Sequence, residues 1–453
     1  MENMQINSEA RTTGSWDSFA TWINANANNS TWFTGGVIVA SGIWVASWDL
    51  IIVGLLSYAF MTVSAYMGYK TGLPSMYLTR PSFGIRGSIL PSFINIIQFM
   101  GWAAANTFIA ALSMAMILHS IFGLPDVTSK NSFLSVGLGI FIMMILHILA
   151  VSLGEKSIRL LQRFGVWLIY ILVIWELIVV FKNFSIHQLL SWRPSAKIKM
   201  PIGTAIETMA VFNLGWATAG SDFSRFSKNK ISGLLLPFIG INIGTWWFAA
   251  VGMLSTVAMA ISLNRFDPNN SDPSAVATKL GLGIVALLVI VVTSTASNAV
   301  SLLAAGSAYN NIFKKQGFNK SLMIVTIFAS VISFIPVFAS SFLNAFMGFL
   351  TIIGMTLIPV IPIYLLDFYV IKKRKYDVRE FDKVKGKYWY NAGVNWIAII
   401  SWMVGVGAYN FFAQWTAVSS TVGMSFETLI VTGIVYYLLT KICILIKERR
   451  KND

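Results

Sequence analysis

The residues best suited to binding chemistry are two tryptophans set beside small residues in otherwise apolar segments. Trp102 follows Gly101, and Trp216 follows Gly215. An indole ring with open space beside it can stack on a flat ligand, and indoles from different helices can hold one heterocycle between them. Asn106 lies one helical turn after Trp102, so its amide can reach the edge of the same ligand. The pattern predicts a binding site for a planar heterocycle.

The residues just before Trp216 fit the same site. Phe212 and Asn213 lie about one helical turn upstream, and Gly215 lets the helix unwind so that a ligand reaches backbone groups. Trp102 and Asn106 have ordinary alternatives, because tryptophans also form belts at the membrane surface and asparagines form hydrogen bonds between helices. Trp102 falls near the middle of its segment, where such belts do not reach, so ligand stacking is the stronger interpretation for it.

A run of hydroxyl side chains interrupts another apolar segment at residues 293–298, and it includes Ser294 and Thr295. Hydroxyl oxygens, together with backbone carbonyls freed by a helix break near Asn28, are the neutral oxygen ligands that Na⁺ accepts. In the common alternative, each hydroxyl only donates to the carbonyl four residues earlier. We expect a Na⁺ site built from Ser294, Thr295 and the Asn28 carbonyl.

Carboxylates inside apolar segments are costly, so each one is a candidate functional group. Glu207 and, less strongly, Glu176 could carry a proton, whereas Asp49 is expected at the membrane surface. Asp222 lies shortly before Arg225 and is expected to pair with it as a cap or a gate. A proton is therefore the alternative to Na⁺ as the coupling ion.

Catalytic and cofactor-binding motifs are missing from the sequence. The three histidines, His119, His147 and His187, lie far apart without cysteine or carboxylate at metal-ligand spacing, and Cys443 is the single cysteine. No glycine-rich loop carries the lysine of an ATP-binding site. We expect no enzyme activity and no cofactor, with energy drawn from an ion gradient.

These residues belong to a chain built for a membrane. Its 453 residues are 56% hydrophobic and 11% charged, with a mean hydropathy of +0.69, which excludes an ordinary soluble domain. A span needs roughly 20 apolar residues, and twelve segments qualify. They cover about 17–43, 47–69, 90–119, 132–153, 157–182, 204–222, 231–263, 280–310, 320–338, 341–371, 392–414 and 423–446.

Two of these segments are interrupted. A polar stretch from Asn24 to Thr31 divides the first, and a glycine-containing stretch from Gly215 to Asp222 weakens the sixth. A non-helical backbone survives at membrane depth only where protein or water surrounds it, so each break marks a binding site, with Asn29 as a candidate ligand contact. Breaks at corresponding positions indicate a transporter built from inverted repeats.

Membrane orientation explains the net charge of +15 better than nucleic-acid binding does. Lys and Arg concentrate in the tails and in every second loop, above all at 372–391, and the positive-inside rule assigns these parts to the cytoplasm. The basic loop between the fifth and sixth segments is an exception. We expect a multi-pass protein of the cell membrane, an inner or plasma membrane, with both termini in the cytoplasm.

Four stretches give the chain a resemblance to the nucleobase:cation symporter family, which contains purine, cytosine, allantoin and hydantoin permeases. The loop after the second segment is the most specific, and the spacing through the sixth is most similar to the cytosine permease branch. The matching stretches are 66–73 with 80–88 and 90–91, Gly101-Trp102, Trp216-Ala217-Thr218 with 222–226, and Ser297-Asn298-Ala299.

The resemblance implies an all-α polytopic membrane protein of twelve transmembrane helices. Its fold would be leucine-transporter-like, with 5+5 inverted repeats and discontinuous helices 1 and 6. The corresponding divisions are a cytoplasmic tail at 1–16, a transport core at 17–371 with repeats at 17–182 and 204–371, a basic cytoplasmic loop at 372–391, two additional helices at 392–446 and a tail at 447–453.

The resemblance also assigns roles to individual residues. A planar substrate would lie against Trp102, with Trp216 as the second stacking partner of the hydantoin type and Asn213 beside Phe212 at the position of the cytosine type. The remaining roles it implies are substrate contacts at Asn106 and Asn298 and Na⁺ contacts at Ser294 and Thr295.

The resulting prediction is a secondary active transporter that imports a nucleobase or related planar heterocycle, of the cytosine/purine class, by Na⁺ symport through alternating access. H⁺ is the alternative coupling ion, and hydroxymethylpyrimidine (a thiamine precursor), allantoin or hydantoin is the alternative substrate. From a different class, the alternative is a gated channel for a small polar solute. The expected partners are the heterocycle, the cation and the lipid bilayer, with no nucleic acid and no obligatory protein partner.

Overall fold

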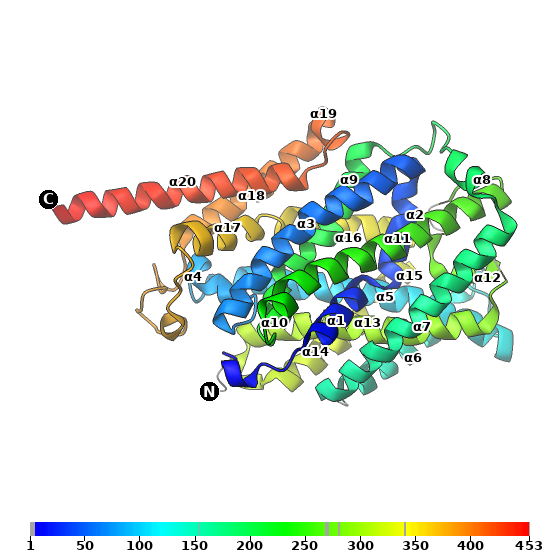
Figure 1. Cartoon of the computed structure of the whole chain (residues 1–453), viewed down its shortest axis with the longest axis horizontal. Helices are drawn as coiled ribbons and strands as arrows, with labels where there is room; N and C mark the ends of the chain where they lie inside the picture. The colour runs from blue at the N-terminus through cyan, green and yellow to red at the C-terminus, as the bar shows by residue number, and fades with distance from the viewer. Residues whose placement is uncertain (1–4, 153, 268–270, 280, 339–340, 453) are drawn as a thin grey trace.

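The protein is helical, as predicted. The structure is a computed structural model that describes residues 5–152, 154–267, 271–279, 281–338 and 341–452. Within these residues no strand forms, and the β-contacts are isolated bridges between Thr13 and Ser227 and between Asn391 and Val394. Figure 1 shows long helices lying alongside one another, with both chain ends at the same end of the molecule.

The predicted segments correspond to single helices or to short helices in series. The first part contains α1 (Ser15–Asn26), α2 (Asn29–Ile38), α3 (Ile43–Thr71), α4 (Arg80–Phe83), α5 (Ile89–Phe122), α6 (Ser132–Ser152), α7 (Gly154–Asn183) and α8 (Ile186–Ser191). The second part contains α9 (Ile202–Leu214), α10 (Gly220–Ser224), α11 (Leu236–Ser262), α12 (Pro273–Lys279), α13 (Gly283–Ile312), α14 (Phe318–Ile332), α15 (Ile335–Phe338), α16 (Phe342–Leu357), α17 (Val360–Leu366), α18 (Trp396–Gln414), α19 (Thr416–Ser419) and α20 (Ser425–Asn452). Short 3-10 or π turns are η1 (Ser8–Ala10), η2 (Val39–Ser41), η3 (Tyr77–Thr79), η4 (Gly215–Thr218), η5 (Ile231–Leu235), η7 (Lys314–Gln316), η8 (Asp367–Ile371) and η9 (Val378–Glu380).

Among the described residues, nine helices are long and apolar enough to cross a membrane. Each coincides with one of the predicted segments. The other predicted segments are the two interrupted ones, which yield short helices, and the fifth, which forms α7. The twelve-span topology, the repeat relationship and the division into domains stay predictions.

The break in the first span is narrower than the polar stretch suggested. α1 continues through Asn26 and α2 begins at Asn29, so Ala27 and Asn28 alone separate the helices. Asn28 has extended backbone, and its side-chain oxygen accepts the backbone N–H of Thr31 at 3.0 Å, which caps α2. The stretch is therefore largely helical, because its polar side chains find partners on other helices.

The sixth span breaks where its glycines predict. α9 ends at Leu214, the chain continues as η4, and α10 begins at Gly220. A Cβ added at Gly220 would lie 2.7 Å from the carbonyl oxygen of Met61 in α3. Glycine is needed here because the backbones of the two helices approach too closely for a side chain.

α11 packs closely against both halves of the broken first span. A Cβ added at Gly244 would lie 2.7 Å from the carbonyl oxygen of Ile23 in α1, and one added at Gly252 would lie 2.0 Å from that of Trp32 in α2. Small residues allow such backbone contact between membrane helices. These helices, together with α3, α9 and α10, form one packed group that we call the bundle.

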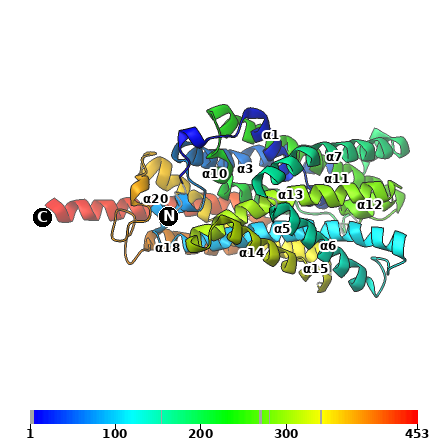
Figure 2. The same ribbon diagram turned by 90° about the horizontal axis from the view of Figure 1, so that it is seen from below.

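A second group, here called the scaffold, is centred on the continuous helices α5 and α13. α6 and α14 pack against them, and Figure 2 shows these helices lying together. A Cβ added at Gly139 of α6 would lie 2.5 Å from the carbonyl oxygen of Ala111 in α5. The scaffold is thus as tightly packed as the bundle, although its helices are unbroken.

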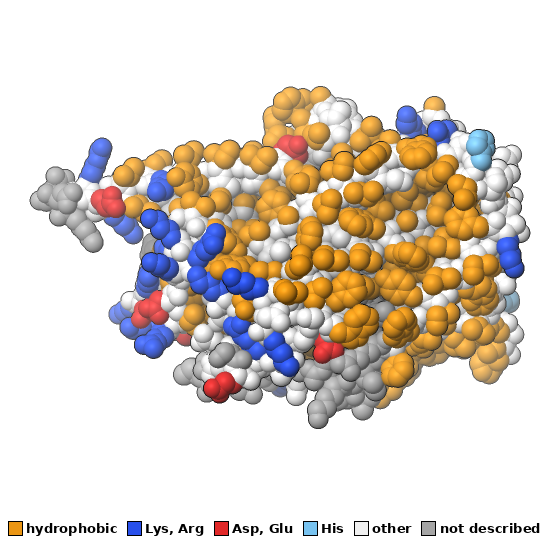
Figure 3. Space-filling view, in the orientation of Figure 1, with side chains coloured by type: hydrophobic (Ala, Val, Ile, Leu, Met, Phe, Trp, Pro, Cys, Tyr) orange, Lys and Arg blue, Asp and Glu red, His pale blue; other side chains and the backbone are white. Residues whose placement is uncertain are grey.

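The surface of the molecule fits a membrane. Figure 3 shows a broad band of hydrophobic side chains over the long helices. Most Lys and Arg side chains on this face gather at the end of the molecule where Figure 1 places the N-terminus and α4. A wide apolar belt with charges displaced to the end is what a multi-pass membrane protein requires.

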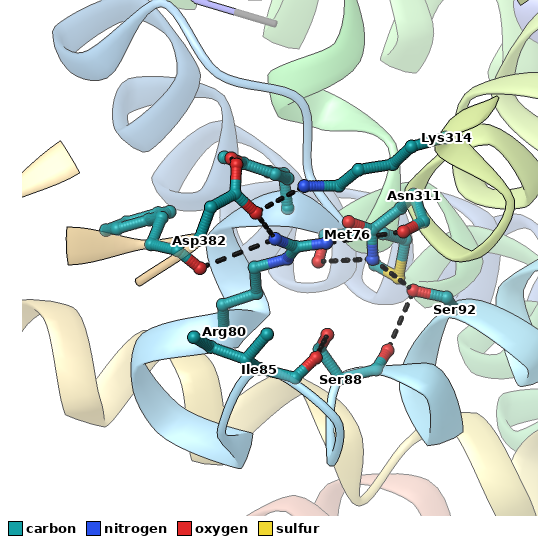
Figure 4. A network of polar contacts seen from close by, with 10 residues as sticks. Met76, Arg80, Ile85, Ser88, Ser92, Asn311, Lys314 and Asp382 are labelled. Carbon is teal, nitrogen blue, oxygen red and sulfur yellow. Dashed lines mark hydrogen bonds and ion pairs between the residues drawn. The ribbon is translucent and has the colours of Figure 1, made fainter. Parts of the chain in front are cut away.

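A charged cluster, here called the clamp, joins three loops at that end. Asp382 pairs with Arg80 at the start of α4 and with Lys314 just after α13 (Figure 4). Arg80 is 4% exposed, and it also donates to the backbone carbonyl of Asn311 at 3.3 Å. Tyr77 donates to Asp382, and the Arg80 guanidinium lies over its ring at 4.2 Å. Sequence reasoning treated the basic loops as topology signals and missed this cluster.

Candidate functional site

The two helix breaks meet inside the bundle. Trp216 in η4 donates its indole N–H to Oδ1 of Asn26, the last residue of α1, at 2.8 Å. An indole nitrogen only donates, so this bond fixes the orientation of the Asn26 amide. Nδ2 of Asn26 then donates to Tyr58 of α3 and, at 2.7 Å, to Thr245 of α11. We call these four residues, together with Asn213, the junction.

Asn213 belongs to the junction through its side-chain oxygen. Oδ1 accepts the hydroxyl of Tyr58 at 2.5 Å, and the side chain is fully buried. Tyr58 lies on α3 and Asn213 on α9, so this hydrogen bond joins two helices. Within the described residues its Nδ2 has no hydrogen-bond partner, which leaves a buried donor available to a ligand or a water molecule.

Trp102 lies in a cage of phenyl rings. Its ring centroid is 5.0 Å from that of Phe212 in α9, and 5.9 Å and 4.9 Å from those of Phe346 and Phe349 in α16. All three contacts are edge-to-face. The structure thus brings Phe212 to Trp102, and a ligand stacked on this indole would replace one of the phenyl contacts.

Trp216 has different ring neighbours. Its centroid lies 5.7 Å from that of Trp22 in α1 and 5.2 Å from that of Phe99 in α5. Among the described residues no direct ring contact joins Trp216 to Trp102. Phe99 lies on α5 one turn before Trp102, so the same helix supplies Trp102 and a ring neighbour of Trp216.

Asn106 connects the scaffold to the first break. Its Oδ1 accepts the backbone N–H of Ser30 at 3.0 Å and the hydroxyl of Ser30 at 2.8 Å. The first N–H groups of a helix have no partner within it, and Asn106 satisfies one at the start of α2. The predicted ligand contact therefore also positions the break.

One candidate Na⁺ residue, Ser294, is brought to the same break. Asn29 at the start of α2 donates to Oγ of Ser294 in α13 at 2.5 Å, which places that hydroxyl beside Asn28. Thr295 donates to the carbonyl of Val291 at 3.0 Å, as the alternative reading expected. Donation uses the hydroxyl hydrogen and leaves oxygen lone pairs, so the bond does not prevent Thr295 from binding a cation.

Asn298 lies within the scaffold. Its Nδ2 donates to the Ala103 carbonyl at 3.1 Å and to the Thr107 hydroxyl at 3.0 Å, and it contacts Nε2 of His147 at 3.2 Å. These bonds tie α13 to α5 and α6. A substrate contact through its oxygen, which has no partner in the described part of the chain, stays a prediction.

Gln98 is a site residue that sequence reasoning missed. Its Nε2 donates to the Gly215 carbonyl at 2.9 Å and to the Thr218 hydroxyl at 3.1 Å, so α5 supplies the partner of a carbonyl freed by the second break. The amide, buried in an apolar segment one turn before Trp102, was the available signal.

Glu207 serves as an anchor. It accepts hydrogen bonds from the Tyr409 hydroxyl at 2.9 Å, from the backbone N–H groups of Met424 and Ser425 at 2.7 Å and 2.8 Å, and from the Ser425 hydroxyl at 2.8 Å. Four donors around one carboxylate stabilise its anionic form. This arrangement joins α9 to the start of α20, and the role of proton carrier stays a prediction.

Asp222 forms a hydrogen bond to the scaffold in addition to its contact with the neighbouring Arg225. Its Oδ1 accepts the hydroxyl of Ser307 in α13. Arg225 donates to the backbone carbonyl of Asp222 at 3.3 Å. The acidic residue therefore links α10 of the bundle to α13 of the scaffold, which is where a gate between the two groups would act.

The chain is similar to known proteins along most of its length. The sequence profile described as "Permease for cytosine/purines, uracil, thiamine, allantoin" matches residues 5–435. A protein named "Putative purine-cytosine permease YxlA", from Bacillus subtilis (strain 168), is 27% identical, with 86% of this chain and 82% of the relative covered. The cytosine permease of Escherichia coli (strain K12) is 23% identical, with 90% and 88% covered.

The fold also matches solved structures. Mhp1, a nucleobase-cation-symport-1 family transporter, was solved in a closed conformation with bromovinylhydantoin bound. This structure aligns with the present one with a TM-score of 0.77 at 16% sequence identity. The alignment covers 96% of this chain and 93% of Mhp1. An inward-facing structure of Mhp1 aligns with a TM-score of 0.76. Since the family profile covers nearly the whole chain, this protein belongs to the family of permeases for cytosine/purines, uracil, thiamine and allantoin.

Proposed function

We propose that this permease is a secondary active transporter that imports a nucleobase or a related planar heterocycle, of the cytosine/purine class, together with Na⁺. The observation that carries the proposal is the junction, where the hydrogen bond from Trp216 to Asn26 joins the two helix breaks. Broken helices that meet inside a membrane protein provide free backbone groups for a substrate. The bundle would rock against the scaffold around this point in alternating access.

The substrate would stack on an indole and be read by amides. Trp102 would supply the stacking face, with the ring of Phe212 beside it at a centroid distance of 5.0 Å. Trp216, Asn106 and Asn298 complete the proposed contacts, with the Nδ2 of Asn213 as a free donor. Base stacking on an aromatic side chain contributes about 1–3 kcal/mol in single-stranded nucleic-acid complexes, enough to shape a site without charge.

The coupling Na⁺ would lie between α13 and the first break. Ser294 and Thr295 offer hydroxyl oxygens, and the chain around Asn28 leaves the helix, which frees carbonyl oxygens. The hydrogen bond from Asn29 to Ser294 supports the placement, because it holds the two sources of oxygen together. Neutral oxygens of this kind suit Na⁺.

The location follows from the same arrangement. The apolar belt supports a multi-pass protein of the cell membrane, and the gathering of Lys and Arg at the end with the N-terminus supports cytoplasmic termini (Figure 3). The direction of transport would then be inward, driven by the Na⁺ gradient.

A binding experiment tests the proposal. The purified protein is heated with nucleobases, hydroxymethylpyrimidine, allantoin or hydantoins, each with and without Na⁺. A ligand that binds only the folded state must raise the unfolding temperature, and Na⁺ should increase that shift. Absence of any stabilising heterocycle would overturn the proposed substrate class.

Allantoin and the hydantoins are alternative substrates that rest on specific observations. The B. subtilis allantoin permease is 23% identical with 88% of this chain covered, and Mhp1 was solved with a hydantoin, so these ring systems belong in the panel. A gated channel is the alternative from another class. It would show neither substrate saturation nor exchange of labelled for unlabelled substrate, and both are expected of a symporter.

A further inference from the structure

Glu176 of α7 is a carboxyl group buried in the apolar part of the molecule. Its side chain is 0% exposed, and its neighbours along the helix, Val173 and Val180, are equally buried. Ser255 of α11 donates a hydrogen bond to Oε1 of Glu176. Oε2 has no hydrogen-bond partner within the described ranges. A charged carboxylate with an unpaired oxygen in such a place is costly unless a cation neutralises it.

No basic side chain supplies that neutralisation in the described part of the chain. α11 and α13, which pack against α7, contain no Asp, Glu, Lys, Arg or His. Of the other helices against α7, α6 carries His147, which contacts Asn298, and α1 carries Asp17 in its first turn. On α7 itself, Tyr170 packs on aromatic rings of α11, and Lys182 is exposed in the last turn. The other charged residues of α7 lie about 20 Å or more from Glu176 along the helix axis, and their side chains are outside the described part of the chain; they are Glu155, Lys156, Arg159 and Arg163.

Asp272, just before α12, is another buried carboxylate. Its oxygens accept the backbone N–H groups of Ser274 at 2.9 Å and Ala275 at 3.1 Å. It caps its own helix and is no partner for Glu176. The simplest cation that neutralises Glu176 without a basic side chain is therefore a proton.

We propose that Glu176 binds a proton that enters the transport cycle, as a second cation position distinct from the hydroxyls of Ser294 and Thr295. The inference rests on the proposed function and specifies its coupling. α7 packs against α1, α11 and α13, so it lies beside the first break and beside the helix of the candidate Na⁺ site. Protonation removes the charge and keeps α7 and α11 in apolar contact, whereas the anion requires water and favours their separation.

The test uses Glu176→Gln in the full-length protein, reconstituted in liposomes with a transported heterocycle. A pH gradient, acidic outside, should stimulate uptake by the wild type and should have no effect on the variant, because glutamine mimics the permanently protonated acid. Exchange of labelled for unlabelled substrate without any gradient should keep the wild-type rate in the variant. A purely structural role would lower both activities together.

A matched control is Asp49→Asn. Asp49 in α3 is 6% exposed, and neither of its carboxyl oxygens has a partner within the described residues. The control should retain stimulation by the pH gradient. Stimulation that survives Glu176→Gln, or that disappears in Asp49→Asn instead, overturns the assignment to Glu176.

Ser255→Ala covers the case in which Glu176→Gln does not fold. This variant keeps the Glu176 carboxyl and removes the hydrogen bond that Ser255 donates to it. The pH midpoint of uptake should therefore move, while maximal uptake is retained. An unchanged midpoint contradicts the proposal. Failure of the wild type to bind or exchange any heterocycle would overturn the proposed function itself, whereas normal exchange without any pH response would overturn the proton site alone.

Discussion

The junction and the clamp both join distant parts of the chain, but they are built from different chemistry. The junction contains amide, hydroxyl and indole groups, and no member of it carries a charge. The clamp contains one carboxylate between two cations, and the side chain of Asp382 is 49% exposed. The junction residues are Asn26, Tyr58, Asn213, Thr245 and Trp216, and all are buried.

The difference reflects how deeply each cluster lies in the apolar belt. Removing an ion from water costs several kcal/mol, so a polar connection at membrane depth is made from neutral groups. Water reaches the end of the molecule, and charges can be used there. In the proposed function, the neutral junction would open around a substrate without exposing a bare charge, whereas the clamp is suited to holding loops in place.

The largest effect is expected from breaking the clamp. Asp382→Asn leaves the buried Arg80 guanidinium without its carboxylate, and losing one partner of a buried pair costs about 3–5 kcal/mol. Because Asp382 is half exposed, the loss should lie near the lower end. Denaturant unfolding in detergent measures it. The control, Asp377→Asn, alters an exposed carboxylate in the same loop and should change stability by less than about 0.5 kcal/mol.

Trp102→Ala should act on binding rather than on the clamp or the junction. Loss of about 1–3 kcal/mol of stacking corresponds to a roughly 5- to 150-fold weaker affinity for the heterocycle. Equilibrium binding to the purified variant measures the change. Phe349→Ala removes a neighbouring ring from the same cage and is the matched control. Affinity within about twofold of wild type in Trp102→Ala would contradict stacking.

Tyr58→Phe should weaken the junction without affecting the clamp. The change removes the hydroxyl that joins Asn26 to Asn213, and an unsatisfied buried partner costs about 1–3 kcal/mol. Because no charge is involved, the loss should be the same at low and high salt, unlike the loss in Asp382→Asn. A salt-dependent effect of Tyr58→Phe would remove the distinction between the two clusters.

The Na⁺ dependence of the ligand-induced stabilisation tests the candidate Na⁺ site at the first break. Ser294→Ala with Thr295→Ala should abolish the increase that Na⁺ gives, while stabilisation by the heterocycle alone remains. Thr293→Ala, one residue away, changes a hydroxyl that bonds to the Val289 carbonyl and serves as the control. Full Na⁺ dependence in the double variant would show that the cation lies elsewhere.

The smallest effect is expected from moderate changes of pH. Burial raises the pKa of Asp382, but hydrogen bonds from Lys314 and Tyr77 and the charge of Arg80 outweigh it and hold that pKa below its usual 3.8. A lowered pKa means that the clamp stabilises the fold above about pH 4 and is lost as the pH falls through the folded-state value. The stability difference between wild type and Asp382→Asn should be constant from about pH 5 to 8 and shrink below about pH 4. The difference caused by Tyr58→Phe should not change.

Much of the architecture was predictable because it depends on local composition. Apolar segments of sufficient length must become membrane helices, and glycine or polar stretches within them must become breaks. The interruption at Gly215 and the family motif around Trp102 were therefore readable in advance. The exact extent of the first break was not, because Asn26 stays helical only when its amide finds partners on other helices.

The sequence by itself determined the class of protein, the helical fold, the two breaks and the family. Tertiary structure alone decided which amides form hydrogen bonds to other helices. Asn26 and Trp216 are 190 residues apart, and Asn29 and Ser294 are 265 apart, so no local pattern could reveal these bonds. The burial of Glu176 beside Ser255, without a basic neighbour in the described residues, likewise emerged only from packing, since desolvation depends on all the helices that surround a group.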